Sequence, residues 1–251
     1  MNRNIITEGI ILKTNRIGEI HKGVTFLSPT LGIVNGIAHG AWKMKSKLRS
    51  VTQTFGYIKA YLYFDPVKDS YKISDVENLL QFFAISKSVE KYFIASLFIE
   101  IIIKSFGGGE SDGGIFTLLL ESLKLLDTPR EDLDVFIIIQ FIYRYLIFTG
   151  FTPQLSSCNR CGTIFGEKTT VLFDNQRMDF LCISCGRPDD VVIHPGYRMY
   201  LDKTIGLPFD KALEIKIDKE GAQTVKKILY ILIESLLGFP LKSLTSGDGI
   251  L

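Results

Sequence analysis

The order of hydrophobic and polar residues changes its period once along the chain. In the first 76 residues the apolar positions fall in short alternating runs separated by turn residues, which predicts about five β-strands. In the clearest run, from Phe55 to Phe64, one face is apolar and the other carries aromatic residues and one cation. The apolar face holds Ile58, Ala60, Leu62 and Phe64, and the other face holds Tyr57, Lys59, Tyr61 and Tyr63. Five short strands in so short a segment are typical of a small barrel.

From about Glu77 onward the apolar residues form longer segments that have the length of helices. They are separated by turn-rich stretches and run from Asn78 to Phe106, from Ile115 to Leu126 and from Asp132 to Phe148. The first two are joined by the glycine-rich stretch GGGESDGG. A further helix is predicted after Asp218, with an apolar stripe and a stop at Gly238 and Pro240. These segments predict a helical domain that is buried on most sides.

The apolar content raises the question of a membrane segment. Hydrophobic residues make up 46% of the chain, and the most apolar run, from Val135 to Phe148, contains Gln140 and Arg144. This run is shorter than the about 20 apolar residues that a membrane-spanning helix needs. The N-terminus lacks the apolar core of a secretion signal. We therefore predict a cytoplasmic protein that does not enter a membrane.

All four cysteines fall in two pairs of the form C-x-x-C, CNRC and CISC. Each such turn aims two thiolates at one point, so two facing turns supply the tetrahedral sulfur set that zinc prefers. The segments TTVLFD and MDFLC between the pairs predict a β-hairpin, as in a zinc ribbon. Four sulfurs leave no open position for a water nucleophile, so we predict one structural zinc ion per chain. Its ligands are Cys158, Cys161, Cys182 and Cys185.

Other uses of the cysteines, and a catalytic site elsewhere, have less support in the sequence. Disulfides are unusual in a cytoplasmic protein, and a redox-active pair does not explain the second C-x-x-C. The histidines His21, His39 and His194 show neither metal-ligand nor triad spacing with another titrating group. We therefore expect no enzymatic activity.

The net charge of +2 conceals a division along the chain. Residues 1–64 hold nine Lys or Arg and two acidic residues, a net charge of +7, while the remaining 20 basic and 25 acidic residues give −5. No carboxylate occurs between Ile20 and Phe64, so the six cations of that segment have no acidic neighbour in sequence. Such an asymmetry points to nucleic acid or another anionic partner.

The densest part of the basic segment is HGAWKMKSKLRS, from His39 to Ser50. It carries cations at every second position, beside the only tryptophan of the chain, Trp42, and these cations are Lys43, Lys45, Lys47 and Arg49. An extended strand would project all four to one side, and a helix would also cluster them. Small barrels bind nucleic acids by combining a cationic groove with aromatic faces that stack on bases. We therefore predict nucleic-acid binding.

Further candidates lie outside the basic run. Lys22 and Lys59 are candidates for phosphate contacts, and Trp42, Tyr57 and Tyr61 are candidates for base stacking. Two simpler interpretations stay open. The run of cations could be an ordinary solvated surface, and the tyrosines could pack against the helical domain.

The order of these parts resembles the RecO family of DNA repair and recombination mediators. The resemblance covers nearly the whole chain and rests on three stretches, LSPTLGIVNGIAHGAWKMKSKLR, FTGFTPQLSSCNRCG and LLGFPLKSL. It implies an α+β multidomain protein with an N-terminal OB-fold barrel, an all-α helical domain and an inserted four-cysteine module similar to a zinc ribbon. It also implies binding of single- and double-stranded DNA, annealing of complementary strands, and cooperation with RecR and single-strand binding protein in loading RecA.

The resemblance also sets the expected boundaries. We expect the OB-fold in residues 1–76, the first part of the helical domain in 77–154, the zinc-binding module in 155–190, and helices that complete the helical domain in 191–251. The family is not enzymatic, and its members associate with the nucleoid during repair. Trp42 departs from the family, whose members often carry another basic residue there. The alternative function is a protein-interaction module whose basic barrel docks acidic tails, such as that of single-strand binding protein.

Overall fold

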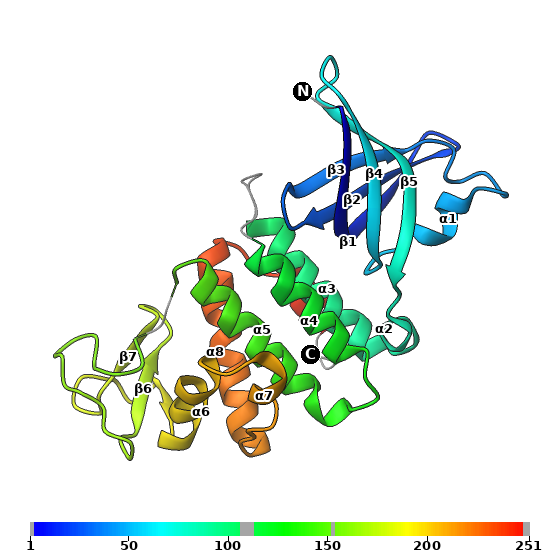
Figure 1. Cartoon of the computed structure of the whole chain (residues 1–251). Coiled ribbons are helices and arrows are strands. Elements are labelled where there is room, and N and C mark those ends of the chain that lie inside the picture. The colour runs from blue at the N-terminus through cyan, green and yellow to red at the C-terminus, as the bar shows by residue number, and fades with distance from the viewer. Residues whose placement is uncertain (1–2, 106–112, 152–153, 248–251) are drawn as a thin grey trace. The chain divides into compact units, whose positions relative to one another are not determined.

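A computed structural model describes residues 3–105, 113–151 and 154–247 of the chain (Figure 1). The described residues form two compact units. The first contains the chain as far as Thr128 together with Ser246 and Gly247, and the second is Pro129–Thr245.

A closed five-stranded barrel opens the first unit, as the alternating pattern predicts (Figure 1). Its strands are β1 (Asn4–Ile17), β2 (His21–Ser28), β3 (Gly32–Ala38), β4 (Tyr57–Asp65) and β5 (Ser70–Leu80). Their order around the barrel is β1-β2-β3-β5-β4, and β1 closes it by pairing with β4. Neighbouring strands are antiparallel except for β3 and β5, which run parallel.

The barrel core confirms the predicted faces of β4. Ile58 and Ala60 are fully buried and Leu62 is nearly so, whereas Phe64, near the end of the strand, is only partly buried. These side chains pack with residues of the other strands, including Val24, Phe26, Val34 and Ile73. Apolar burial on this inner face is the main force that holds the barrel together.

Four helices complete the first unit: α1 (Lys47–Val51), α2 (Phe83–Lys87), α3 (Val89–Ser105) and α4 (Gly114–Leu126). The predicted helix from Asn78 is wrong in its first part, because Asn78 and Leu80 pair with β4 as the end of β5. The helix is also broken at Ser88, whose backbone is extended and whose side chain accepts a hydrogen bond from the backbone of Lys91. Strand pairing and a serine at the start of α3 thus override the apolar pattern. Most of the glycine-rich stretch predicted before α4 lies outside the described residues.

The second unit combines a helical body with a small sheet. It begins with a short 3-10 helix, Glu131–Leu133, and α5 (Asp134–Phe148). A three-stranded sheet in the order β7-β6-β8 follows, and then four helices. The bounds are β6 (Val171–Asp174), β7 (Asp179–Leu181), β8 (Val191–Ile193), α6 (Pro195–Ile205), α7 (Phe209–Ala212), α8 (Lys219–Leu237) and α9 (Lys242–Ser246).

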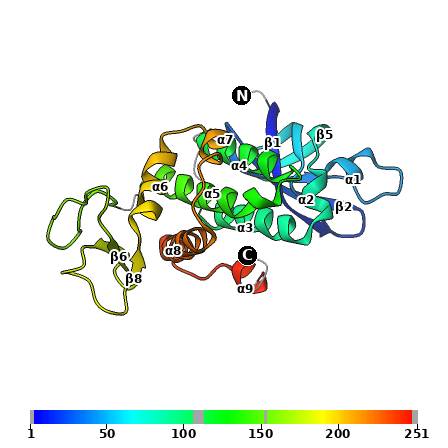
Figure 2. The ribbon, with the colours of Figure 1, turned by 90° about the horizontal axis from the view of Figure 1, so that it is seen from below.

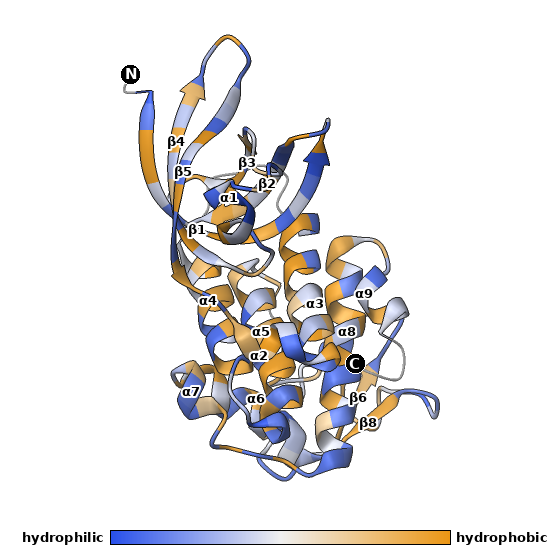
Figure 3. Cartoon of the chain, turned by 90° about the vertical axis from the view of Figure 1, so that its right-hand side faces the viewer, coloured by the Kyte–Doolittle hydropathy of each residue, from blue (hydrophilic) through white to orange (hydrophobic). Residues whose placement is uncertain are grey.

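Helix α8 packs against α5, and its ends are those that the sequence predicts. At the N-terminus the Asp218 carboxylate accepts a hydrogen bond from the backbone of Gly221 at 2.7 Å. At the C-terminus Gly238 has a φ of 77°, the left-handed conformation that ends many helices. Figure 3 shows that α3, α4 and α5 are largely hydrophobic. Even so, within the described ranges no helix is long and apolar enough to cross a membrane.

Candidate functional site

The four cysteines, predicted as metal ligands, come together at one point. All four Sγ atoms lie within 4.8 Å of one another, and the Sγ atoms of Cys161 and Cys182 are 3.7 Å apart. No disulfide joins them. In the part of the chain that the structure describes, they are the only group of three or more His, Cys, Asp or Glu side chains placed closely enough to hold a metal ion. The sulfurs belong to a segment that we call the cysteine module, residues 155–193, which contains the β7-β6-β8 sheet (Figures 1 and 2).

Two tight turns aim the sulfurs. In the first turn the backbone of Gly162 donates to the carbonyl of Cys158 at 2.9 Å, with Gly162 at a φ of 73° that favours glycine. In the second turn the backbones of Cys185 and Gly186 both donate to the carbonyl of Cys182 at 3.0 Å. The predicted hairpin of β6 and β7 connects the turns. The sequence spacing therefore produces the convergence that it predicts.

The sulfur set fits a tetrahedral zinc ion. Zinc–sulfur bonds of about 2.3 Å place the sulfurs of a tetrahedron about 3.8 Å apart, close to the 3.7 Å between Cys161 and Cys182. A hydrogen bond with the Thr163 hydroxyl is the main cause that lowers the pKa of the Cys161 thiol to about 6, whereas hydrogen bonds with Cys161 and Cys182 raise the pKa of the Cys185 thiol to about 12. Metal binding would release the protons of these thiols, because the thiolate is the form that binds metal.

One buried arginine fastens the cysteine module to helix α6. The Arg198 guanidinium is 6% exposed and donates to the carbonyls of Leu155 at 3.1 Å and Gly166 at 2.6 Å. Its Cζ atom lies 5.9 Å from the centre of the Phe165 ring. The module is therefore held by a charged side chain that the sequence analysis did not single out. No local sequence signal marks this role, because Arg198 is 43 and 32 residues from its two acceptors.

The basic run forms a loop between β3 and β4, residues 39–52, that we call the cationic loop. It is neither an extended strand nor a continuous helix. Turns held by hydrogen bonds from the backbone of Lys43 to Gly40 and from Ser46 to Lys43 lead into the short helix α1. Gly40 takes a φ of 69° at the first turn. Leu48 and Val51 anchor α1 because they pack against the barrel core.

The four cations of the loop face solvent. Lys43, Lys45, Lys47 and Arg49 are all exposed, and among the described residues none of them forms an ion pair. Helix α1 has no acidic residue in its first turn. The charge division seen in the sequence is therefore present on the surface as an unneutralised patch.

Two cations lie close to the ring of Trp42 at the start of this loop. The Lys22 Nζ atom lies 5.4 Å and the Arg49 Cζ atom 5.8 Å from the centre of its ring. Its backbone also donates to the carbonyl of Ile20 at 3.0 Å, and 37% of the residue remains exposed. The indole therefore contacts neighbouring cations and stays partly open to solvent.

Lys22, a predicted phosphate contact, lies in the interior with 2% exposure. Its ammonium donates to the backbone carbonyl of Thr52, just after α1. Burial, and secondarily the charge of Arg49, lowers the pKa of Lys22. Lys22 therefore holds the end of the loop through Thr52 and does not add to the exposed charge of the loop.

Lys59, the other predicted cation outside the run, lies between two acids. In the strand register Glu8 of β1 is directly opposite Lys59 on one side, and Glu77 of β5 is opposite on the other. The Lys59 Nζ atom is 5.6 Å from the Tyr61 ring, whose hydroxyl donates to Glu77. Sequence could not reveal these neighbours, because both acids lie outside the carboxylate-free segment.

Tyr57 takes part in packing. Its ring meets the Phe116 ring of α4 at a centroid distance of 6.1 Å, and its hydroxyl donates to Glu8. Burial, and then the hydrogen bond with Glu8, raises the pKa of Tyr57 to about 12. The contact with α4 is the packing against helices that is the alternative to base stacking.

Comparisons with known proteins match both halves of the chain. Residues 1–82 match the family model described as Recombination protein O N terminal, and residues 86–245 match Recombination protein O C terminal. A protein of Oceanobacillus iheyensis named DNA repair protein RecO is 30% identical over 240 residues, which cover 94% of this chain and 90% of the relative. Proteins with the same name from Thermoanaerobacter sp. and Syntrophus aciditrophicus are 26% and 28% identical, covering 96% and 97% of this chain and 96% and 95% of their own lengths.

Proposed function

Because this chain belongs to the RecO family of DNA repair proteins, we propose that it is a recombination mediator that binds DNA without reading its sequence. It holds single- and double-stranded DNA through phosphate contacts and has no enzymatic activity of its own. It anneals complementary strands and, with RecR, assists loading of RecA onto DNA coated by single-strand binding protein.

The exposed charge of the cationic loop carries this proposal. Lys43, Lys45, Lys47 and Arg49 present four positive charges without an acidic partner among the described residues. Phosphate contacts release counterions and give affinity for any sequence. Trp42 adds an aromatic face beside them, suited to stacking on a base.

The same arrangement supports annealing. Cations that neutralise the backbones of two strands reduce their repulsion and leave the base edges free to pair. Lys22 and Lys59 contribute less to this surface, since one is buried and the other lies between Glu8 and Glu77. We assign the main phosphate contacts to the four loop cations.

We assign the cysteine module a structural zinc ion. Cys158, Cys161, Cys182 and Cys185 would hold it, and four sulfur ligands leave no position for a reacting water. The ion would fix the two turns with respect to each other, so that the module keeps a defined surface. Its role is therefore scaffolding.

The test of DNA binding is a salt titration on single-stranded DNA. Four neutralised phosphates give a slope of log affinity against log salt of about −3. Changing Lys43, Lys45, Lys47 and Arg49 together to Ala should flatten this slope by about 0.7 for each phosphate that is no longer neutralised. A matched control changes four exposed helical lysines, Lys124, Lys203, Lys219 and Lys227, to Ala and so removes the same charge elsewhere.

An unchanged slope in the loop variant, or an equal change in the control, would overturn the assignment. Binding of an acidic peptide tests the alternative function. If the loop variant keeps the original salt slope for DNA but no longer binds the peptide, the loop docks a protein tail instead.

A further inference from the structure

A second feature of the first unit has the properties of a binding pocket. A cavity of about 330 Å³ lies between strand β1 and helix α3, and its lining includes Lys13, Thr54, Phe55, Tyr92, Glu100 and Lys104. This volume is at the lower end of the range for small-ligand sites, about 300–1,000 Å³. A site of this size holds one small organic group rather than a length of polypeptide.

Two backbone irregularities meet at this cavity. The register of β1 with β2 shifts between Ile11 and Lys13, a β-bulge that places Leu12 and Lys13 at the cavity wall. Opposite the bulge, Phe55 has a φ of 71°, which is costly for an aromatic residue. The backbone of Phe55 donates to the carbonyl of Ile11 at 2.8 Å, and the backbone of Ile11 donates to Gly56 at 2.9 Å. The strained residue is therefore tied to the bulge.

Aromatic rings form one wall. Phe55 is 6% exposed and meets the edge of Tyr92 at a centroid distance of 5.3 Å and an angle of 86°. Tyr92 is 50% exposed, so part of its ring stays available to a ligand. Ile99 and Ile103 continue the same wall along α3.

The charged residues at the cavity leave a positive excess. Glu100 pairs with Lys104 at 2.7 Å, so their charges cancel. Lys13 is exposed and forms no ion pair within the described ranges. A planar aromatic group linked to an anion matches an aromatic wall beside a cation.

The cavity is also close in sequence to the cationic loop. Thr54 follows Val51, the last residue of α1, by three positions, a span of at most about 11 Å. The Gln53 side chain, between them, donates to the carbonyl of Arg49 at 2.9 Å. The cavity therefore lies near the C-terminal end of the cationic loop.

We propose that this cavity receives one unpaired base of a bound DNA strand, with Tyr92 as the stacking surface and Lys13 as the contact to the neighbouring phosphate. The inference rests on the proposed DNA binding and extends it to a second subsite. It makes the protein prefer single strands, because a paired base cannot enter the cavity.

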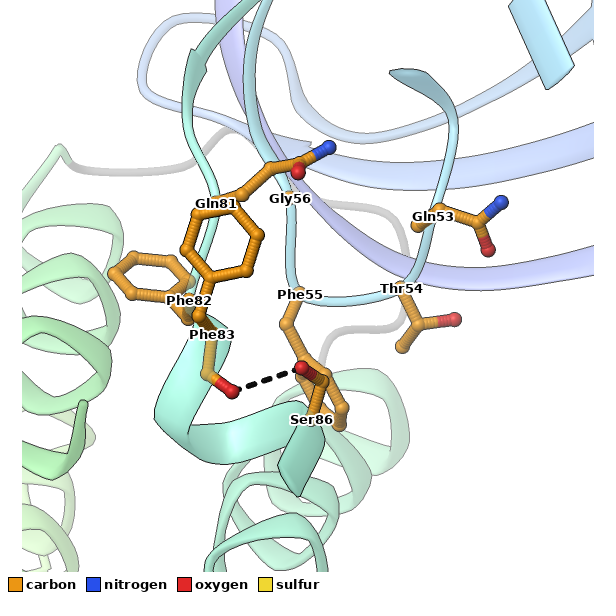
Figure 4. Close-up of a pocket in the computed structure, with 8 residues that line it drawn as sticks. All are labelled: Gln53, Thr54, Phe55, Gly56, Gln81, Phe82, Phe83 and Ser86. Carbon is orange, nitrogen blue, oxygen red and sulfur yellow. Dashed lines mark hydrogen bonds between the residues drawn. The ribbon is translucent and has the colours of Figure 1, made fainter. Parts of the chain in front are cut away.

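A neighbouring pocket provides the control. A smaller cavity of about 170 Å³ lies next to α2 (Figure 4), and its lining includes Gln53, Phe55, Phe82 and Phe83. Phe83 is 62% exposed there and does not line the larger cavity. Its removal takes away an exposed aromatic ring from the adjacent surface without touching Tyr92.

The test compares Tyr92→Ala, Tyr92→Phe and Phe83→Ala with the unchanged full-length protein. Binding is measured on an ordinary single strand, on a duplex, and on a strand of the same length in which every base is missing. We expect Tyr92→Ala to weaken binding to the ordinary strand by about 5- to 160-fold, the loss of one stacked base. Tyr92→Phe and Phe83→Ala should stay within about twofold of the unchanged protein. On the base-free strand and on the duplex all four proteins should bind alike.

Several results would overturn the proposal that the cavity binds a base. One is normal binding of the ordinary strand by Tyr92→Ala, and another is an equal loss on the base-free strand. A third is a defect of Tyr92→Ala only in binding RecR, which would make the cavity a protein site. If Tyr92→Ala is unfolded by circular dichroism, Tyr92→Leu replaces it, because leucine keeps the apolar contact with Phe55. A salt slope retained by Tyr92→Ala would leave the proposed function intact, whereas an unchanged protein that lacks salt-dependent DNA binding would overturn both.

Discussion

The cysteine module and the cationic loop each depend on four side chains of one chemical kind, but they use them in opposite ways. The four Sγ atoms lie within 4.8 Å of one another, close enough to bind one metal ion together. The four cations point to solvent and have no ion-pair partner in the described part of the chain. One site is complete when its side chains meet, and the other is useful because its side chains are left unpaired.

The difference decides how far each site can be recognised. Convergence of the sulfurs is a local property, since each C-x-x-C turn is built from adjacent residues. Availability of a cation depends on every residue that the fold brings near it. Lys59 and Lys45 both lie in the segment of the sequence that has no carboxylate. In the fold, however, Lys59 has Glu8 and Glu77 opposite it on the neighbouring strands.

The largest effect is expected when one of the four clustered cysteines is replaced. Cys158→Ser replaces the buried ligand, and loss of zinc should remove on the order of 10 kcal/mol of local folding free energy. Metal analysis should give one zinc per unchanged chain and none in the variant. Hydrogen exchange should show reduced protection in residues 155–193 and retained protection in β1–β5. An unchanged, metal-free chain with a protected module would contradict the structural role.

A second change separates the module's attachment from its metal. Arg198→Ala removes two charge-assisted hydrogen bonds, to Leu155 and Gly166, and should cost about 3 kcal/mol in the free energy of unfolding of the second unit. Zinc content should be unchanged. Denaturant unfolding followed by hydrogen exchange measures this, with Arg177→Ala, at an exposed arginine of the same module, as the control. Equal effects of the two changes would show that Arg198 is not the attachment.

The smallest expected effect is the difference between Lys45, in the cationic loop, and Lys59, on β4. Lys45→Ala should flatten the salt slope for single-stranded DNA by about 0.7, the value for one phosphate contact. Lys59→Ala should leave the slope nearly unchanged, because the carboxylates of Glu8 and Glu77 stand opposite Lys59 on the two neighbouring strands and would repel a phosphate there. Equal slopes for the two variants would mean that the acids do not shield Lys59.

Much of the fold could be predicted from the sequence. Strict alternation placed Ile58, Ala60 and Leu62 inside the barrel, and the spacing of the cysteines predicted their cluster and hairpin. The missed features all depend on partners that are distant in sequence. Asn78 is a strand residue because Ile58 pairs with it, and Lys22 is buried because the carbonyl of Thr52 accepts its hydrogen bond.

The cavity beside Tyr92 illustrates the same limit. Neither the bulge after Ile11 nor the positive φ of Phe55 has a residue signal, because glycine or asparagine would be the usual marker of such a backbone. The cavity exists only once β1, the segment before β4 and α3 are assembled.

The pairing order of the barrel has a consequence for how the protein is made. Strand β5 is the last barrel strand in sequence, and it pairs with both β3 and β4. During synthesis the barrel therefore stays open until Ser70–Leu80 has emerged, although β1, β2 and β3 can already form a meander. Until then β3 exposes an unpaired edge next to the most cationic part of the chain. Closure of the barrel and protection of this edge thus occur in one late step, which makes β5 the segment where a folding defect would most directly cause aggregation.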